Sequence, residues 1–206
     1  MAQIDFFYDL TSPWTYLAFT GMPAIAQRYS ADIVWRPILV GGVFNAVNQE
    51  LYAKREAAFG NERQLNQMLK DLGDWAKLRG IAINWPSFHP ASAVKCMRGC
   101  FVAEAQGKLL DYSQAVFEAY WGRCEDVSED AVLTNIVAAL GMDATAFLTE
   151  IKTQPVKDRL RANTDEVIAR GGFGSPTIFV NGDDMYFGND RLPLVEAALS
   201  RLAQQG

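Results

Sequence analysis

The sequence predicts an α/β fold in which strands from both ends of the chain form one sheet and the residues between them are helical. Short runs rich in aromatic and β-branched residues lie near the start, at residues 4–10 and 32–39, and near the end, at residues 176–180 and 185–187. Apolar residues at helical spacing fill most of residues 49–170. The predicted order is therefore β-α-β, a long helical segment, and β-β-α.

The first unit begins with residues 4–10, IDFFYDL, whose continuous apolar run is typical of a buried strand. Ser12 and Pro13 then open a helix, because serine caps helices well and proline is tolerated at the first helical position. Helical spacing continues to about residue 29, and residues 32–39 form the second strand. A β-α-β unit normally places its two strands in parallel. We expect a loop at residues 41–48.

The middle of the chain contains predicted helices joined by short connectors. They cover residues 65–78, 91–104, 109–121, 129–140, 144–152 and 155–169, with a proline-bounded connector at residues 81–90. Gly171 and Gly172 end the last of these helices. In the closing unit, Asn181-Gly182 is a tight hairpin signal between the two strands. Asn189-Asp190 then cap a final amphipathic helix that extends to about residue 202.

This order of elements is that of the thioredoxin fold, with a helical insert between its two halves. We therefore expect a thioredoxin-like domain made of residues 1–48 and 171–206, whose two halves share one sheet, and a helical insert domain at residues 49–170. A chain of 206 residues can bury such a core without disulfides or metals.

Composition narrows the classes of partner. A formal net charge of −5 favours neither nucleic acid nor an anionic membrane as a partner. No apolar run approaches the roughly 18 residues that span a bilayer, and no signal-peptide pattern precedes the first strand, so we expect a cytoplasmic protein. Three cysteines and one histidine predict neither a disulfide framework nor a metal site. Cys96 and Cys100 should share a buried helix face, and the reactivity of these two thiols and of Cys124 stays open.

Ser12 is the first residue that points to chemistry. It follows the first strand and begins the first helix, where free backbone N–H groups and the helix dipole stabilise an anion such as a thiolate. A redox thioredoxin carries Cys-x-x-Cys at this place, whereas this chain has Ser12-Pro13-Trp14-Thr15, which excludes disulfide exchange there. The Ser12 hydroxyl can donate a hydrogen bond to a thiolate brought by another molecule. The alternative is a plain helix N-cap.

Two further segments are expected on the same rim of the fold. Pro176, just before the third strand, should be cis, and Ser175 would then offer its backbone to an extended peptide. An ordinary proline at a strand start is the alternative. Asn189 and Asp190 open the last helix, where N–H groups suit a carboxylate and the Asp190 side chain suits an ammonium. A thiol, a peptide backbone and an α-amino-acid group are the three parts of glutathione.

Both ends of the chain carry a family resemblance. The run from Phe7 to Ala18, FYDLTSPWTYLA, looks like the opening motif of the 2-hydroxychromene-2-carboxylate isomerase family. The runs FGSPT at residues 173–177 and FGNDR at residues 187–191 look like its closing motifs. That family is similar to kappa-class glutathione transferases and, more distantly, to DsbA-type oxidoreductases. The resemblance covers essentially the whole chain, and it implies glutathione as a cofactor.

The resemblance also implies site residues. Ser12 matches the serine that contacts the glutathione sulfur, and Ser175-Pro176 match the segment whose main chain pairs with the cysteinyl part. The remaining glutathione contacts implied are Asn48 in a polar loop and, for the γ-glutamyl group, Phe187, Gly188, Asn189 and Asp190. The resemblance implies His89 at the substrate, with a surface histidine next to two prolines as the alternative, and Trp14 and Trp85 could form part of an aromatic wall there. A basic residue should meet the glycyl carboxylate, and Lys54, Arg55 and Arg63 are the choices.

The implied activity is isomerisation of 2-hydroxychromene-2-carboxylate to trans-o-hydroxybenzylidenepyruvate by reversible thiolate addition, as in naphthalene-type catabolism. One alternative is a kappa-like glutathione transferase, which would use the same site and release a conjugate. Another is a non-catalytic thioredoxin-fold binding module. The resemblance also implies a homodimer, although no stripe of exposed residues in the sequence requires one.

Overall fold

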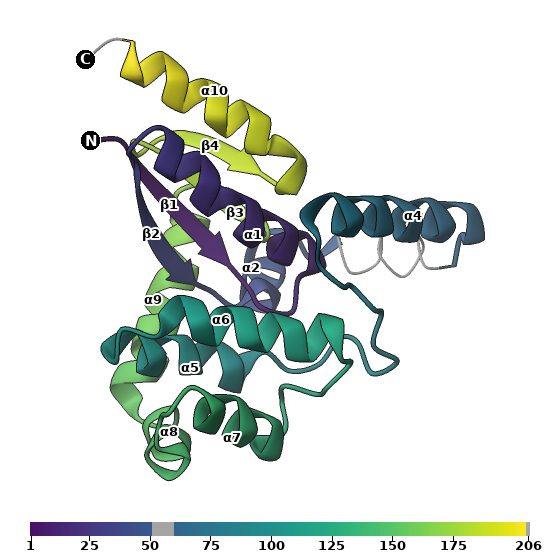
Figure 1. Ribbon diagram of the computed structural model, residues 1–206, viewed down its shortest axis with the longest axis vertical. Coiled ribbons are helices and arrows are strands. Elements are labelled where there is room, and N and C mark those ends of the chain that lie inside the picture. Colours follow the sequence, from purple (N-terminus) through teal and green to yellow (C-terminus); the bar gives the residue numbers. More distant parts are fainter. Residues whose placement is uncertain (51–59, 205–206) are drawn as a thin grey trace.

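A computed structural model describes residues 1–50 and 60–204 of the chain. Its single sheet has four strands in the order β2-β1-β3-β4, drawn in the upper half of Figure 1. β1 (Gln3–Tyr8) pairs in parallel with β2 (Asp32–Pro37), and antiparallel with β3 (Thr177–Val180). β3 pairs antiparallel with β4 (Asp184–Phe187). All four predicted strands and their parallel and hairpin connections are confirmed, with ends that differ by one to two residues.

The two central strands, β1 and β3, are buried on both faces, which explains the uninterrupted apolar run of β1. Ile4, Phe6 and Tyr8 alternate with Phe7, and the two sets enter different hydrophobic clusters. The larger cluster packs α1 (Pro13–Arg28), α10 (Leu192–Ala203) and the helical insert onto one face. The smaller cluster packs α2 (Val40–Val47) and α9 (Gln154–Ala169) onto the other.

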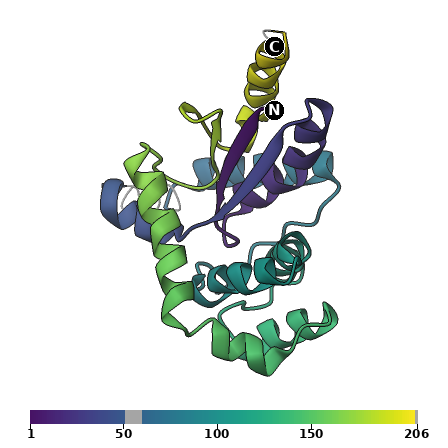
Figure 2. The same ribbon diagram turned by 90° about the vertical axis from the view of Figure 1, so that its left-hand side faces the viewer.

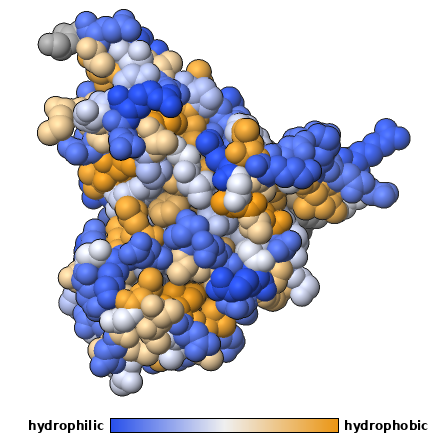
Figure 3. Space-filling model, in the orientation of Figure 1, coloured by the Kyte–Doolittle hydropathy of each residue, from blue (hydrophilic) through white to orange (hydrophobic). Residues whose placement is uncertain are grey.

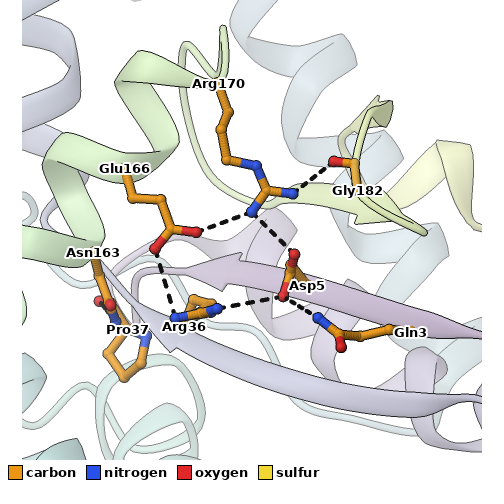
Figure 4. Close-up of polar contacts among 8 residues, drawn as sticks. All are labelled: Gln3, Asp5, Arg36, Pro37, Asn163, Glu166, Arg170 and Gly182. Atoms are coloured by element: carbon orange, nitrogen blue, oxygen red, sulfur yellow. Dashed lines mark hydrogen bonds and ion pairs between the residues drawn. The ribbon is translucent and has the colours of Figure 1, made fainter.

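One carboxylate is held inside the second face. Asp5 of β1 is 5% exposed and lies 3.0 Å from a nitrogen of Arg170 and 3.6 Å from one of Arg36. Figure 4 shows both arginines also reaching Glu166 on α9, so the four charges form one network across β1, β2 and α9. Because the Asp5 carboxylate is paired twice, its burial is compensated.

The middle of the chain is helical, as predicted. Its helices are α4 (Glu62–Arg79), α5 (Val94–Ala105), α6 (Leu109–Phe117), α7 (Asp130–Ala139), α8 (Ala144–Glu150) and α9, with a π-helical turn η1 (Glu118–Gly122) after α6. Figure 1 shows α5 to α8 beneath the sheet and α4 projecting to one side. Figure 2 shows α9 returning from that group to the sheet. The larger hydrophobic cluster contains residues of both the sheet and the insert. The proposed boundaries between a thioredoxin-like domain and a helical insert domain stay a prediction.

Three local expectations were wrong. Residues 41–48 are not a loop, since α2 occupies Val40–Val47. Two adjacent glycines make this helix hard to predict from the sequence. It is stabilised by tertiary contacts, because a carboxylate oxygen of Asp9 accepts the N–H of Val40 at 2.9 Å, and Val43 and Phe44 are buried. The helix expected at 109–121 ends at Phe117 and continues as the π-helical turn. The capping of the last helix is corrected below.

None of the described helices is both long enough and apolar enough to cross a membrane.

Candidate active site

A cavity of about 640 Å³ opens where the sheet, α4 and the helical insert meet. Figure 3 shows apolar residues gathered where the base of α4 joins the body of the molecule. The walls come from the α1 N-terminus, the start of α2, one side of α4, the connector before α5 and the segment before β3. Six residues expected in the site line this cavity: Ser12, Trp14, Trp85, His89, Ser175 and Phe187.

Ser12 lies at the positive end of α1. It is the N-cap, as the alternative interpretation held, and its Oγ accepts the N–H of Thr15 at 3.3 Å. The same hydroxyl donates to the carbonyl of Ser175 at 3.4 Å. Both hydrogen bonds are long, so the hydroxyl can turn toward a ligand at little cost. Among the described residues that line the cavity there is no cysteine.

The Ser175-Pro176 peptide bond is cis, as predicted. The Ser175 side chain is held inside the protein, because its Oγ accepts the N–H of Asp9 at 2.9 Å and lies 2.7 Å from Oγ1 of Thr15. Among the described residues, none accepts a hydrogen bond from the N–H of Ser175. That N–H can therefore serve an extended ligand at the cavity wall. Pro176 itself does not line the cavity.

Asp9 connects three parts of the site, and the sequence analysis missed it. It is 1% exposed at the end of β1, and one carboxylate oxygen accepts the N–H of Thr11 at 2.8 Å and its hydroxyl at 2.7 Å. The other oxygen accepts from Val40 at the start of α2. Burial raises the pKa of Asp9, while these hydrogen bonds oppose the shift. An acidic residue at the end of a buried strand, two residues before a Thr-Ser helix start, is the signal that could have revealed it.

The segment after β4 departs from its predicted capping role. Asn189 and Asp190 form a short 3-10 turn, η2 (Asn189–Arg191), and neither side chain caps α10. The reason is that these residues form the turn itself, and α10 begins only after it, at Leu192. Gly188 has φ of 102°, a conformation that favours glycine, and an added Cβ would lie 2.8 Å from an oxygen of Asp190.

The polar groups of this segment differ in their surroundings. Asn189 is 1% exposed, and among the described residues neither its Oδ1 nor its Nδ2 has a hydrogen-bond partner. The Asp190 carboxylate is exposed and lies 3.3 Å from Arg191. Phe187 lines the cavity and packs against Phe173, with ring centroids 4.4 Å apart. Gly188, Asn189 and Asp190 follow it and do not line the cavity themselves.

The residues expected near the glycyl carboxylate of glutathione form the least defined part of the site. Asn48 ends α2 and donates from Nδ2 to the carbonyl of Phe173 at 3.5 Å, outside the cavity lining. Lys54 and Arg55 lie outside the described residues. Arg63 is exposed in the first turn of α4, next to Gln64, which does line the cavity.

His89, Trp85 and Trp14 lie along the apolar part of the cavity lining. The ring of His89 is 4.8 Å from that of Trp85 and 5.2 Å from that of Trp121. Nδ1 of His89 is 2.8 Å from the hydroxyl of Tyr120. The described lining contains no lysine or arginine, so this imidazole is its only side chain able to carry a positive charge.

The three cysteines lie away from the cavity lining. Cys96 and Cys100 are free and fully buried on α5, which confirms their expected place on a buried helix face. Burial raises the pKa of the Cys100 thiol to about 12, and it raises that of Cys96 as well. Cys124 is half-buried.

The chain is similar to known proteins over nearly its whole length. The chain is 30% identical over 202 residues to the 2-hydroxychromene-2-carboxylate isomerase of Pseudomonas putida, covering 98% of this chain and 96% of that protein. It is 27% identical over 206 residues to glutathione S-transferase kappa 1 of Rattus norvegicus, covering 93% and 88%. A solved structure of 2-hydroxychromene-2-carboxylate isomerase superposes with a TM-score of 0.82 at 29% identity, over 98% of this chain and 97% of that one. The family model of the DSBA-like thioredoxin domain matches residues 3–200, and the chain therefore belongs to this family.

Proposed function

We propose that this protein is a glutathione-dependent isomerase of a small aromatic carboxylate, and that the cavity is its active site. The proposed reaction converts 2-hydroxychromene-2-carboxylate to trans-o-hydroxybenzylidenepyruvate. The observation that carries the proposal is Ser12, a hydroxyl at the N-terminus of a long helix, in a cavity whose described lining offers no thiol of its own. Isomerase-named relatives at 30% and 27% identity support the reaction type.

The role of Ser12 is to stabilise a sulfur anion. Its hydroxyl can exchange the 3.4 Å hydrogen bond to Ser175 for a stronger one to a thiolate. The free N–H groups of α1 add the favourable field of the helix dipole. One pKa unit corresponds to about 1.4 kcal/mol, so the two effects together can lower a thiol pKa by roughly one to two units. When bound, glutathione supplies the thiolate that adds reversibly to the conjugated double bond of the substrate.

The rest of the protein offers groups that suit the other parts of glutathione. The N–H of Ser175 suits the peptide carbonyl of the cysteinyl part. The exposed Asp190 carboxylate suits the γ-glutamyl ammonium, in exchange for its contact with Arg191. The buried, unpartnered amide of Asn189 suits the neighbouring γ-glutamyl carboxylate. Ser175 lines the cavity together with Phe187, and Asn189 and Asp190 follow Phe187 in η2.

The substrate would occupy the part of the cavity lined by Trp14, Trp85 and His89. The two indole rings suit a flat aromatic ring, and His89 suits the substrate carboxylate or carbonyl. No lysine or arginine among the described lining residues competes with His89 for that role.

Calorimetry with glutathione tests the site. We expect Asp190→Ala to weaken binding about tenfold to a hundredfold, since a hydrogen bond to a charged group contributes about 1.5–3 kcal/mol. The matched control is Asp183→Ala, which removes another exposed aspartate, in the turn between β3 and β4, and should leave binding unchanged. Ser12→Ala should abolish isomerisation in an absorbance assay, while Ser12→Thr, which keeps the hydroxyl, should retain part of it. Absence of glutathione binding at millimolar concentration would overturn the proposal.

A kappa-like glutathione transferase is the second candidate, because a kappa transferase is 27% identical over nearly the whole chain. The two activities separate by mass balance. An isomerase leaves the glutathione concentration unchanged over many turnovers, whereas a transferase consumes one molecule for each conjugate released. If glutathione neither binds nor reacts, a non-catalytic binding module of the same fold is the account that remains.

A further inference from the structure

The short segment that carries Ser12 is held by side chains as much as by backbone. After β1 ends at Tyr8, the chain dips toward α5 and α6 before it turns back into α1 (Figure 1). All four N–H groups from Asp9 to Ser12 are paired, three of them with the side-chain atoms Ser175 Oγ, Met97 Sδ and Asp9 Oδ1. The position of Ser12 therefore depends on these side chains as well as on the ends of β1 and α1.

The helical insert holds both peptide groups of Leu10, two residues before Ser12. Leu10 is fully buried, and its N–H donates to Sδ of Met97 on α5 at 3.2 Å. Its carbonyl accepts the indole N–H of Trp121, in η1, at 3.3 Å. Among the described residues, no backbone group pairs with either peptide group of Leu10. Because buried peptide groups need partners, removing either side-chain atom leaves a polar group of this segment unpaired.

Trp121 also packs behind the aromatic part of the cavity lining. Its ring is 5.7 Å from that of Trp85 and 5.2 Å from that of His89, and these two residues, the aromatic wall, line the cavity. Trp121 itself has 0% exposure and does not line the cavity. It belongs to a π-helical turn, and such turns are rare and frequently lie at functional sites. One indole therefore contacts both the segment that carries Ser12 and the aromatic wall.

We propose that Trp121 and Met97 are positioning residues that fix where Ser12 lies relative to the aromatic wall. The inference rests on the proposed function, in which glutathione brings its sulfur to Ser12 and the substrate lies against the wall. The sulfur must then meet a carbon of the substrate in the correct geometry, and a displacement of about 1 Å can cost roughly 100-fold in rate. Because neither positioning residue lines the cavity, the affinity for glutathione should not depend on them.

Amide hydrogen exchange tests the contacts with Leu10 without glutathione. Trp121→Phe keeps an aromatic ring but leaves the Leu10 carbonyl unpaired, and we expect exchange of the amides of residues 9–12 to become roughly 5- to 150-fold faster. Met97→Leu nearly conserves volume, removes the sulfur acceptor and should accelerate the same amides. The matched control is Trp35→Phe, the same substitution on β2 against the same hydrophobic cluster, which should leave these amides as slow as in the wild type.

Steady-state kinetics test the consequence for the reaction. With the chromene carboxylate as substrate, Trp121→Phe should lower kcat at least about tenfold, while the Kd for glutathione stays within about twofold of the wild-type value. Met97→Leu should lower kcat in the same direction, and Trp35→Phe should change neither constant. If Trp121→Phe does not fold, benzothienylalanine at position 121 replaces only the indole N–H by sulfur, and it should give the same faster exchange and lower kcat.

The outcomes separate this proposal from the proposed function. Unchanged exchange in Trp121→Phe overturns the role of Trp121 in holding Leu10. Faster exchange with an unchanged kcat overturns the positioning role, and so does a Kd for glutathione that rises as much as kcat falls, because the whole site would then be disturbed. Absence of glutathione binding by the wild type would defeat the proposed function and the positioning role with it, while exchange would still show whether Trp121 and Met97 hold the segment.

Discussion

Gly99 on α5 is the position where one added methyl group should have the largest effect on stability. A Cβ built there would lie 2.6 Å from Cζ of Phe147 and 2.7 Å from Cζ of Tyr112, and closer still to the Tyr112 hydroxyl. Both rings are almost fully buried, at 1% and 0% exposure, so neither can swing into solvent. In Gly99→Ala, α5 must therefore move away from α6 and α8, or the rings must leave their preferred rotamers.

The magnitude follows from three contributions. Overpacking a dense core costs about 1–3 kcal/mol. Displacing Tyr112 also breaks its 3.0 Å hydrogen bond to the carbonyl of Cys96, and leaving these groups unpaired costs about 1–3 kcal/mol. Alanine is better than glycine inside a helix by about 0.5–1 kcal/mol, which offsets part of the loss. We expect Gly99→Ala to lower the free energy of unfolding by about 2–4 kcal/mol.

Urea denaturation followed by circular dichroism measures this loss. The matched control is Gly73→Ala on α4, where nothing lies within 4 Å of the added Cβ, and where we expect a gain of about 0.5–1 kcal/mol. If Gly99→Ala were as stable as the wild type while Gly73→Ala behaved as expected, the packing of α5 against α6 and α8 would be looser than described, and the reasoning would fail.

Three further predictions concern buried ionisable groups. Asp5→Ala should cost about 2–3 kcal/mol in urea denaturation, because two half-buried arginines lose the carboxylate they share (Figure 4); a loss below about 0.5 kcal/mol would contradict this. Burial raises the pKa of Asp9, so the folded state keeps that proton to higher pH than the unfolded state does. The stability of the wild type relative to Asp9→Asn should therefore be greatest below about pH 4 and fall as the pH rises through the raised pKa, and a difference that is independent of pH would refute the assignment. With the pKa of Cys100 raised to about 12, iodoacetamide should label Cys124 in the native protein and Cys100 only after unfolding, as peptide mass spectrometry would show; equal labelling of both in the native state would be the contrary result.

Much of the fold could be predicted because local patterns and tertiary packing agree. β1 is buried on both faces, so it appears in the sequence as a continuous apolar run. Ser12-Pro13 marks the start of α1 with the residues that helix N-termini favour. α2 could not be predicted, because Gly41 and Gly42 weaken its intrinsic helix propensity and its first N–H is paired by Asp9, which is distant in sequence.

Some residues of the candidate site could also be predicted from the sequence, and others could not. Ser12, Ser175 and Phe187 could be selected from motifs at the two ends of the chain, and they do line one cavity. The hydrogen bonds made by Asp9 and Tyr120 could not be predicted, because an aspartate before a helix and a tyrosine within a helical pattern are both common without any role in a site. Their partners, Val40 and His89, are each 31 residues away in the sequence.

The sequence by itself determined the order of strands and helices, the absence of a thiol at the α1 N-terminus and the family of the protein, because each depends on residue type and local spacing. Only the tertiary structure decided that Asp9 joins α1, α2 and the segment before β3, and that the Tyr120 hydroxyl contacts His89 in the connector before α5. The physical reason is that a hydrogen bond between buried groups depends on where packing places the donor and the acceptor. That placement comes from the contacts of the whole core rather than from either residue's neighbours along the chain.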